Sequence, residues 1–143
     1  MVFTASPARL RFMLLERAVS IVGAIKENRM RNPDILVDER TITLRDILGE
    51  LLSGVSKSTD KLALQVADIY VFMIQELTFA EGEPGLERLN NISMILDIEL
   101  ETWRQVCDAQ LKRSVPAPAM ISMGTDGTSG HTNTAAGSLN FTA

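Results

Sequence analysis

The sequence has few of the residues on which many enzymes and metal-binding modules depend. Its 143 residues include one cysteine, one histidine, one tryptophan and one tyrosine, and only 5% of them are aromatic. A single cysteine cannot close an internal disulfide, and with one histidine it cannot complete a structural zinc site. These shortages exclude a disulfide scaffold, a Cys/His zinc module and a catalytic centre that needs two histidines.

Positive charge and long apolar stretches are also scarce. The chain has 14 basic and 18 acidic residues, which gives a net charge of −4. Nucleic acids and anionic membrane surfaces attract clustered Lys and Arg, so we expect neither as a partner. No uninterrupted apolar run approaches the roughly 18 residues of a membrane span, which predicts no membrane insertion. The N-terminus lacks the basic and then apolar pattern of a secretory signal, so a cytoplasmic location is expected.

The composition changes abruptly after Arg113. Residues 114–143 are mostly Ser, Thr, Gly, Ala, Asn and Pro, with Asp126 as the one charged side chain and with the only histidine, His131. Such a segment cannot bury enough apolar surface to offset the entropy lost on ordering. We therefore predict a helical bundle domain over 1–113 and a disordered tail over 114–143.

The body of the chain has four stretches with a helical hydrophobic period and no extended strand-like alternation. They cover about Pro7–Met30, Pro33 or Asp38 to Lys57, Asp60–Ala80 and Pro84–Leu111. The links between them are short, which favours antiparallel neighbours. The pattern predicts an all-α fold, an antiparallel up-down four-helix bundle.

Apolar faces can be assigned to three of these stretches. Ser6 is a suitable N-cap for the first, and Pro7 suits a first helical turn. The expected core positions are Leu10, Leu14, Ala18, Ile21 and Ile25 in the first stretch, Leu44, Ile47, Leu48, Leu51, Leu52 and Val55 in the second, and Leu89, Ile92, Leu96, Leu100, Trp103 and Cys107 in the fourth. In the first stretch, Phe12, Leu15, Val19 and Val22 widen the apolar face considerably, so that this helix too has an excess of apolar surface.

The third stretch is unusual because apolar residues cover roughly 220° of its circumference, whereas an outer helix of a bundle needs an apolar stripe of about 100° or somewhat more. Its remaining strip holds polar residues such as Asp68 and Glu76, but also Phe72 and Phe79. Two explanations stay open. The helix is central to a tightly packed bundle or a dimer, or it forms a groove for an amphipathic helix of another protein.

The helical wheel suggests which side chains would contact such a partner. Those on the third helix that the core needs least are Leu64, Ala67, Val71 and Ile74, and further candidates are Leu44, Leu48 and Ile98. For each of them, ordinary core packing is the competing interpretation. No Lys or Arg occurs between Lys61 and Arg88, which is compatible with a basic partner segment or with a solvated face.

Motifs that carry chemistry are not found. The sequence contains no glycine-rich phosphate loop, and no predicted helix carries the Glu-x-x-His pair of di-metal bundles. Asp97, Glu101 and Asp108 share one side of the last helix beside Arg104, which suggests either an oxygen-ligand metal site or a solvated stripe with a Glu101–Arg104 pair. We favour the stripe, assign Cys107 to the core, and predict no catalytic residue, no metal site and no cofactor.

Three segments together resemble the flagellin-specific export chaperone family FliS. Thr4-Ala5-Ser6-Pro7 followed by Leu10 and Phe12-Met13-Leu14-Leu15 resembles the N-terminal signature of that family. Ala67-Asp68-Ile69-Tyr70-Val71-Phe72-Met73 followed by Leu77 is similar to its helix-3 signature, and Trp103 is similar to its Trp late in helix 4. The resemblance covers roughly residues 4–111, although Arg9 stands where the family often has an acidic residue.

The resemblance implies a cytoplasmic helical-bundle chaperone that is not an enzyme. Such a protein binds the disordered, amphipathic C-terminal segment of flagellin in surface grooves, prevents premature polymerisation and aids delivery to the flagellar export apparatus. An export-gate component is a further candidate partner, and both monomer and homodimer remain open. The alternative is a self-associating helical structural or adaptor protein that uses the same apolar surface for dimerisation.

Overall fold

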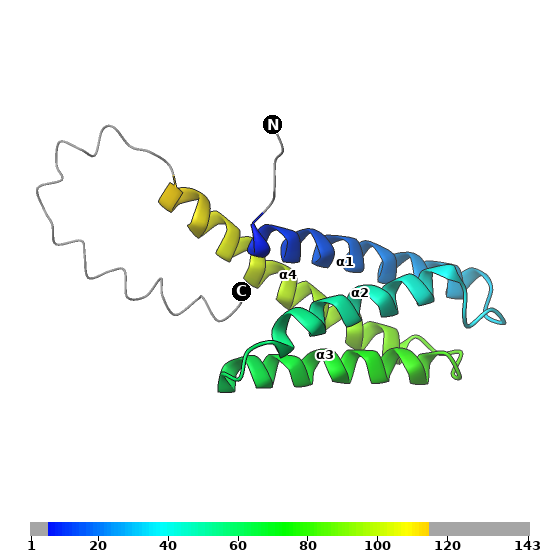
Figure 1. Cartoon of the computed structure of the whole chain (residues 1–143). Coiled ribbons are helices and arrows are strands. Elements are labelled where there is room, and N and C mark those ends of the chain that lie inside the picture. Colours follow the sequence, from blue (N-terminus) through cyan, green and yellow to red (C-terminus); the bar gives the residue numbers. More distant parts are fainter. Residues whose placement is uncertain (1–5, 115–143) are drawn as a thin grey trace, which may run out of the picture.

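The computed structural model describes residues 6–114, which form four α-helices and their connections (Figure 1). The helices are α1 (Pro7–Arg31), α2 (Glu39–Ser56), α3 (Lys61–Ala80) and α4 (Glu87–Ser114). The predicted all-α bundle is confirmed. The predicted tail, 114–143, lies outside the described residues except for Ser114, with which α4 ends.

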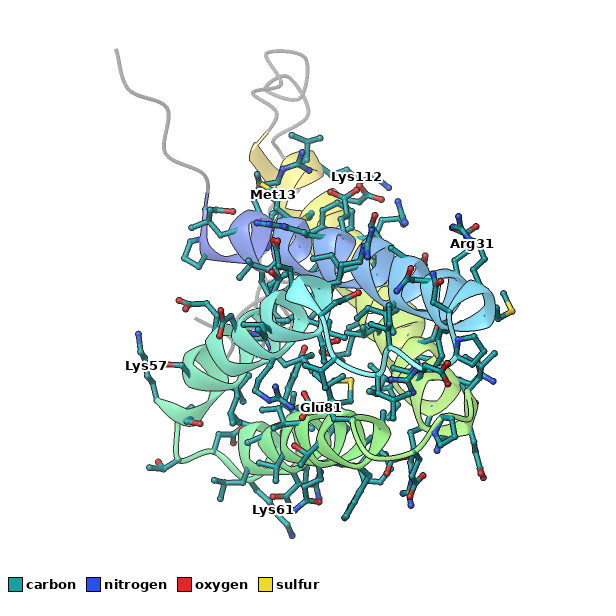
Figure 2. All side chains as sticks on the ribbon, turned by 90° about the vertical axis from the view of Figure 1, so that its right-hand side faces the viewer. Met13, Arg31, Lys57, Lys61, Glu81 and Lys112 are labelled. Atoms are coloured by element: carbon teal, nitrogen blue, oxygen red, sulfur yellow. The ribbon has the colours of Figure 1, made fainter. Side chains whose placement is uncertain are left out.

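The four helices form a ring in which each packs on two neighbours. Helix α1 lies against α2 and α4, and α3 lies against the same two helices from the opposite side. Figure 2 looks along the bundle and shows α1 above, α3 below, and α2 and α4 between them on the two sides. The α1–α2 and α3–α4 loops share one end of the bundle, and the C-terminal part of α4 projects beyond the other end (Figure 1).

Side-chain caps fix where the first two helices begin. The Ser6 hydroxyl accepts a hydrogen bond from the backbone N–H of Arg9 at 3.1 Å, as the sequence predicts. Before α2, the Asp38 carboxylate accepts from the N–H groups of Arg40 and Thr41, while the Thr41 hydroxyl accepts from the N–H of Asp38. This reciprocal capping box satisfies backbone donors that would otherwise lack partners. Of the two predicted starts for this helix, Asp38 is therefore the correct one.

The core is built from the inward faces of all four helices, and most of the predicted positions are confirmed. The largest fully buried apolar side chains are Tyr70, Leu15, Leu44, Leu48, Leu51, Met73, Leu77, Leu89, Ile92, Leu96 and Val22. The predicted face of α1 is wrong in part. Leu10 is exposed and Leu14 and Ile21 are only partly buried, because α1 turns its Leu15–Ala18–Val22 side towards the centre.

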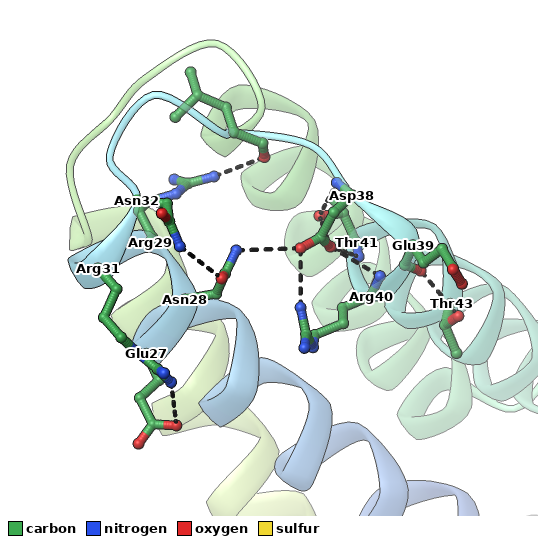
Figure 3. Close-up of polar contacts among 11 residues, drawn as sticks. Glu27, Asn28, Arg29, Arg31, Asn32, Asp38, Glu39, Arg40, Thr41 and Thr43 are labelled. Carbon is green, nitrogen blue, oxygen red and sulfur yellow. Dashed lines mark hydrogen bonds and ion pairs between the residues drawn. The ribbon is translucent and has the colours of Figure 1, made fainter.

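Arg29 holds the two loops at one end of the bundle together. Its guanidinium donates to the carbonyl oxygens of Glu83 at 3.0 Å and Gly85 at 3.2 Å, both in the α3–α4 loop. A third hydrogen bond, 2.9 Å long, goes to the carbonyl of Leu36 in the α1–α2 loop (Figure 3). Burial lowers the pKa of Arg29, and nearby Asp38 opposes that shift. Because the side chain is buried, these bonds form away from solvent.

The prediction that Glu76 lies on a polar, solvated strip of the third helix is wrong. The side chain is buried between α3 and α4, where its carboxylate accepts from Arg88 at 2.7 Å and from Asn91 at 2.8 Å. Burial alone would raise the pKa of Glu76, but the hydrogen bonds from Asn91 and Arg88 outweigh it and lower the pKa below its usual value. The carboxylate therefore joins two helices as an ion.

By length and composition alone, α3 is long and apolar enough to cross a membrane, which the run lengths in the sequence did not predict. A helix of a soluble bundle can have the same character, and although only 28% of this apolar stretch is buried, its Tyr70, Met73 and Leu77 side chains are fully enclosed by the neighbouring helices. Its apolar content is therefore weak evidence for a membrane span.

Candidate functional site

A groove of about 800 Å³ lies between α1 and α2. Its apolar lining comes from Pro7, Leu10, Met13 and Leu14 of α1 and from Ile47 and Leu51 of α2. Leu10 and Met13 are both about half exposed. Figure 2 shows Met13 on the outer side of α1. Exposed apolar surface of this kind is unfavourable in water, and an amphipathic helix of a partner protein can bury it.

Charged side chains of opposite sign stand on the two walls of this α1–α2 groove. Arg17 contributes a positive charge from α1, whereas Asp46 and Glu50 contribute negative charges from α2. Because the two rims differ in sign, a helix with complementary rows of charge would be favoured in one orientation and disfavoured in the other.

Gly54 brings α2 close to α1 at one end of the groove. A Cβ atom at this position would lie 3.4 Å from Nη1 of Arg11, at ordinary contact distance but with no room to spare. The same Nη1 donates to the carbonyl oxygen of Leu51 at 3.1 Å. At Gly54 the Arg11 guanidinium therefore passes close beneath α2 on its way into the bundle.

Arg11 is the residue that sequence reasoning missed most clearly. It is only 8% exposed, and from its position in α1 it contacts each of the three other helices. Its guanidinium carbon lies 5.1 Å from the ring centre of Tyr70 and 5.2 Å from that of Trp103, so the cation is flanked by aromatic rings from α3 and α4. Such contacts contribute about 2 kcal/mol each when they are desolvated.

Tyr70 extends this buried cluster to α4 by a hydrogen bond. Its hydroxyl donates to Oε1 of Glu99 at 2.5 Å. Burial raises the pKa of Tyr70, Arg11 opposes the rise, and Glu99 adds to it. The phenol therefore stays protonated and keeps its donor role, as expected from a ring that packs inside and directs its hydroxyl to an edge.

Two of the predicted partner-contact residues are wrong. Leu44 and Leu48 are fully buried in the bundle, with no exposed surface to offer. Both lie on the centre line of the inward face of α2, between Thr41 and Leu51, and so they pack against the core rather than line the groove. The error arises because a helical wheel does not show which part of an apolar stripe faces the centre.

The other five predicted residues keep exposed surface. Leu64 is 53%, Val71 40% and Ile98 62% exposed, while Ala67 and Ile74 are partly buried against the core. They do not form one site with the α1–α2 groove, whose lining includes none of them. Ile98 also lies on a different helix from the other four. The structure thus offers an apolar outer face on α3 in addition to the groove.

The acidic side of α4 shows ordinary surface pairing. The Glu101 carboxylate accepts from Arg104 at 3.2 Å and from Gln105 at 3.1 Å, so the predicted Glu101–Arg104 pair is confirmed.

Cys107 is partly buried, and burial raises the pKa of its thiol, with a smaller opposing contribution from Arg9. Within residues 6–114, no three His, Cys, Asp or Glu side chains are grouped closely enough to hold a metal ion.

Residues 1–110 match the sequence model of the family described as flagellar protein FliS. The chain belongs to the FliS family. This match covers the whole bundle except the last residues of α4, and it carries the flagellar export chaperone role of the family. FliS proteins are a chaperone family and are not known as enzymes. No curated protein and no solved structure matches the chain significantly.

Proposed function

We propose that this FliS protein binds the C-terminal segment of flagellin as an amphipathic helix in the α1–α2 groove. Binding there would keep the segment from polymerising early and would hold it ready for the flagellar export apparatus in the cytoplasm. The observation that carries the proposal is the exposed apolar lining of the groove, above all Leu10 and Met13, in a chain whose family acts on flagellar export.

The shape of the groove suits a helix better than an extended strand. An α-helix places apolar residues at i, i+3, i+4 and i+7 along one face, which suits a groove whose apolar walls are themselves two helices. A β-strand would need an exposed sheet edge to pair with, and the described residues form helices and loops. The charges of Arg17 on one rim and of Asp46 and Glu50 on the other would set the direction of the bound helix.

One groove alone is a small contact for a segment that must become ordered on binding. Coupled folding and binding costs about 2–5 kcal/mol or more, which a longer interface offsets. We therefore propose that the client continues past the groove onto the outer face of α3. Leu64, Ala67, Val71 and Ile74 would provide apolar contacts there, with Ile98 on α4 as a further contact.

Isothermal titration calorimetry with a peptide of the flagellin C-terminal segment tests the groove. Wild-type protein should bind with a negative heat-capacity change, because apolar surface is buried. Met13→Asp should weaken binding at least tenfold, since it places a charge in the apolar lining. Met30→Asp is the matched control: this methionine is also in α1 and is exposed, but it does not line the groove, so binding should change less than twofold.

Equal losses in both variants, or no binding by the wild type at tens of micromolar, would contradict the groove. Light scattering then separates the alternative of self-association. A dimer that persists in the presence of excess flagellin peptide would indicate that the apolar surface serves dimerisation instead.

A further inference from the structure

The side of the bundle where α3 meets α4 carries a line of residues that the α1–α2 groove does not use. Two contacts mark this line: Glu76 accepts a hydrogen bond from Asn91 at 2.8 Å, and Val66 lines one pocket together with Thr102. Steps of three or four residues from these contacts keep to the same side of each helix. The residues on the line are Leu62, Val66, Ile69, Phe72 and Glu76 of α3 and Asn91, Met94, Ile98 and Thr102 of α4.

Most of these residues are apolar, and many of them are open to solvent. Leu62, Ile69 and Phe72 are exposed on α3, and Met94 and Ile98 are exposed on α4. We call these residues the α3–α4 face. Single exposed apolar side chains are ordinary on a protein surface, but a row that follows two packed helices is a surface that a partner can bury.

A pocket of about 210 Å³ opens at one end of the α3–α4 face. Its apolar walls are Val55 of α2, Leu62 and Val66 of α3 and Trp103 of α4, and Leu62 and Thr102 are exposed at its mouth. It lies where the C-terminal part of α4 diverges from the start of α3 (Figure 1). Small-molecule sites usually have roughly 300–1,000 Å³, so this smaller pocket suits a single apolar side chain that anchors a partner.

The charges beside the α3–α4 face are acidic. Asp68 and Asp97 are exposed, each is next in sequence to a residue of the face, and neither takes part in an ion pair within residues 6–114. Arg88 and Arg104 on α4 are already paired with glutamates, and Lys61 is the one basic residue of α3. A partner helix with Lys or Arg along its edges would therefore be attracted, whereas acidic edges would be repelled.

The same charges argue against two occupants that this chain could itself supply. A second copy would bring the unpaired Asp68 and Asp97 carboxylates of both molecules to one interface, where like charges oppose association. The segment 115–143 contains no Lys or Arg, so it could not pair with these carboxylates either. The charge pattern thus favours a different protein as the occupant.

We propose that the α3–α4 face docks an amphipathic helix with basic edges from a second protein. One apolar side chain of that helix sits in the pocket beside Trp103, and its further apolar residues at i+3, i+4 and i+7 cover the rest of the face. Asp68 and Asp97 pair with its basic side chains. None of the residues of the face lines the α1–α2 groove, so the groove stays open to the client while this partner is bound.

Trp103 reports the docking, because it is the only tryptophan in the chain and it lines the pocket. The full-length protein is titrated with a capped peptide of about 18 residues, long enough to be helical, that has Leu along one face and Lys and Ala elsewhere. This Lys peptide should shift the Trp103 emission and saturate. The same peptide with Glu in place of each Lys should bind at least tenfold more weakly. No emission change with the Lys peptide, or equal binding of both peptides, would overturn the proposal.

Leu62→Gln and Leu64→Gln form a matched pair that tests the apolar contact. Both leave the charge unchanged, and the two leucines are 50% and 53% exposed at the same end of α3, but only Leu62 lines the pocket. Leu62→Gln should weaken binding of the Lys peptide at least fivefold, and Leu64→Gln should change it less than twofold. Leu62 is chosen rather than Ile98 because the client is also proposed to contact Ile98. Should Leu62→Gln fail to fold, Met94→Gln should weaken binding in the same way. Equal effects at 62 and 64 would overturn the proposal.

Asp97→Lys tests the electrostatic contribution. It should weaken binding of the Lys peptide at least fivefold, because it reverses a charge beside the face. Glu16→Lys is the control: Glu16 is exposed on α1, on the opposite side of the ring, and its reversal changes the net charge equally. That variant should change binding less than twofold. Equal losses in the two variants would mean that the net charge alone attracts the peptide, which would overturn the proposal.

A flagellin C-terminal peptide separates this face from the α1–α2 groove. Its binding should be weakened by Met13→Asp and kept in Leu62→Gln, whereas the Lys peptide should show the reverse. If the Lys peptide loses affinity in Met13→Asp and not in Leu62→Gln, it lies in the groove and the α3–α4 proposal is refuted. If the flagellin peptide does not bind but the Lys peptide behaves as expected, the groove function fails and the α3–α4 proposal stands. A dimer in light scattering that Leu62→Gln dissociates would show that a second copy covers the face, which also refutes the proposal.

Discussion

Arg29→Met isolates the polar role of the residue that ties the two loops together. Methionine keeps an apolar stem of similar reach but removes the three hydrogen bonds to the carbonyls of Glu83, Gly85 and Leu36. Hydrogen bonds that involve a charged group contribute about 1.5–3 kcal/mol each. Once the guanidinium is gone, water can hydrogen-bond to the loop carbonyls and restore part of the lost stabilisation. We therefore expect the free energy of unfolding to fall by about 3 kcal/mol in total.

Chemical and thermal denaturation measure this loss. In a domain of this size, 1 kcal/mol lowers Tm by about 4 °C or more, so Arg29→Met should lower it by about 12 °C or more. Hydrogen exchange in the α1–α2 and α3–α4 loops should speed up, while exchange at the other end of the bundle should change little. Arg29→Lys should lose an intermediate amount, because a compact ammonium cannot span three carbonyls held apart.

Arg31→Met provides the matched control in the same turn of α1. Arg31 pairs with Glu27 at 3.4 Å, and both side chains are about two-thirds exposed (Figure 3). Exposed pairs contribute little, so this variant should change stability by less than about 0.5 kcal/mol. A loss below about 1 kcal/mol in Arg29→Met, or equal losses at the two positions, would refute the view that Arg29 joins the loops.

Other perturbations have equally definite outcomes. Glu76→Gln should be less stable than wild type at neutral pH, and this difference should disappear on acidification. The pKa of Glu76 is lower in the folded state than in the unfolded state. The carboxylate therefore stabilises the fold above its unfolded-state pKa, and this stabilisation is lost as the pH falls through its folded-state pKa. Urea titrations at pH 7 and pH 3 measure this, and a constant difference would contradict it. Gly23→Ala and Gly49→Ala should each stabilise the protein by roughly 0.5–1 kcal/mol, because both glycines are helical and a Cβ there meets nothing within 4 Å; a lower Tm in either variant would be the contrary result. Leu48→Asp should unfold the bundle, whereas Val71→Asp should shift the free energy of unfolding by less than about 1 kcal/mol, as circular dichroism melts can test.

The sequence was sufficient for the fold because its local signals agree with one another. Ser6 and Asp38 cap helices in the structure, and the apolar spacing from Leu89 to Trp103 matches the buried face of α4. Short links then leave antiparallel packing as the simplest arrangement. Where every local preference favours the same structure, the pattern alone predicts it well.

The candidate site could be predicted only in part, because it depends on how far each helix is rotated about its own axis. The excess of apolar surface on the first helix was visible, but Leu10 and Leu14 were assigned to the core and line the groove instead. Arg11 and Glu76 were missed for a related reason. A wheel assigns charged residues to solvent, whereas partners on other helices, which are distant in sequence, keep both of them inside.

Site-specific cross-linking tests most directly whether the client lies in the α1–α2 groove. In a Cys107→Ser background, Met13→Cys and Met30→Cys each carry one thiol on α1, to which a short photoactivated cross-linker is attached. After illumination with the flagellin C-terminal segment, the thiol at 13 should give a covalent adduct that excess unlabelled segment prevents, and the thiol at 30 should give none. Adducts from 30 and none from 13, at saturating client, would contradict the groove as the binding site.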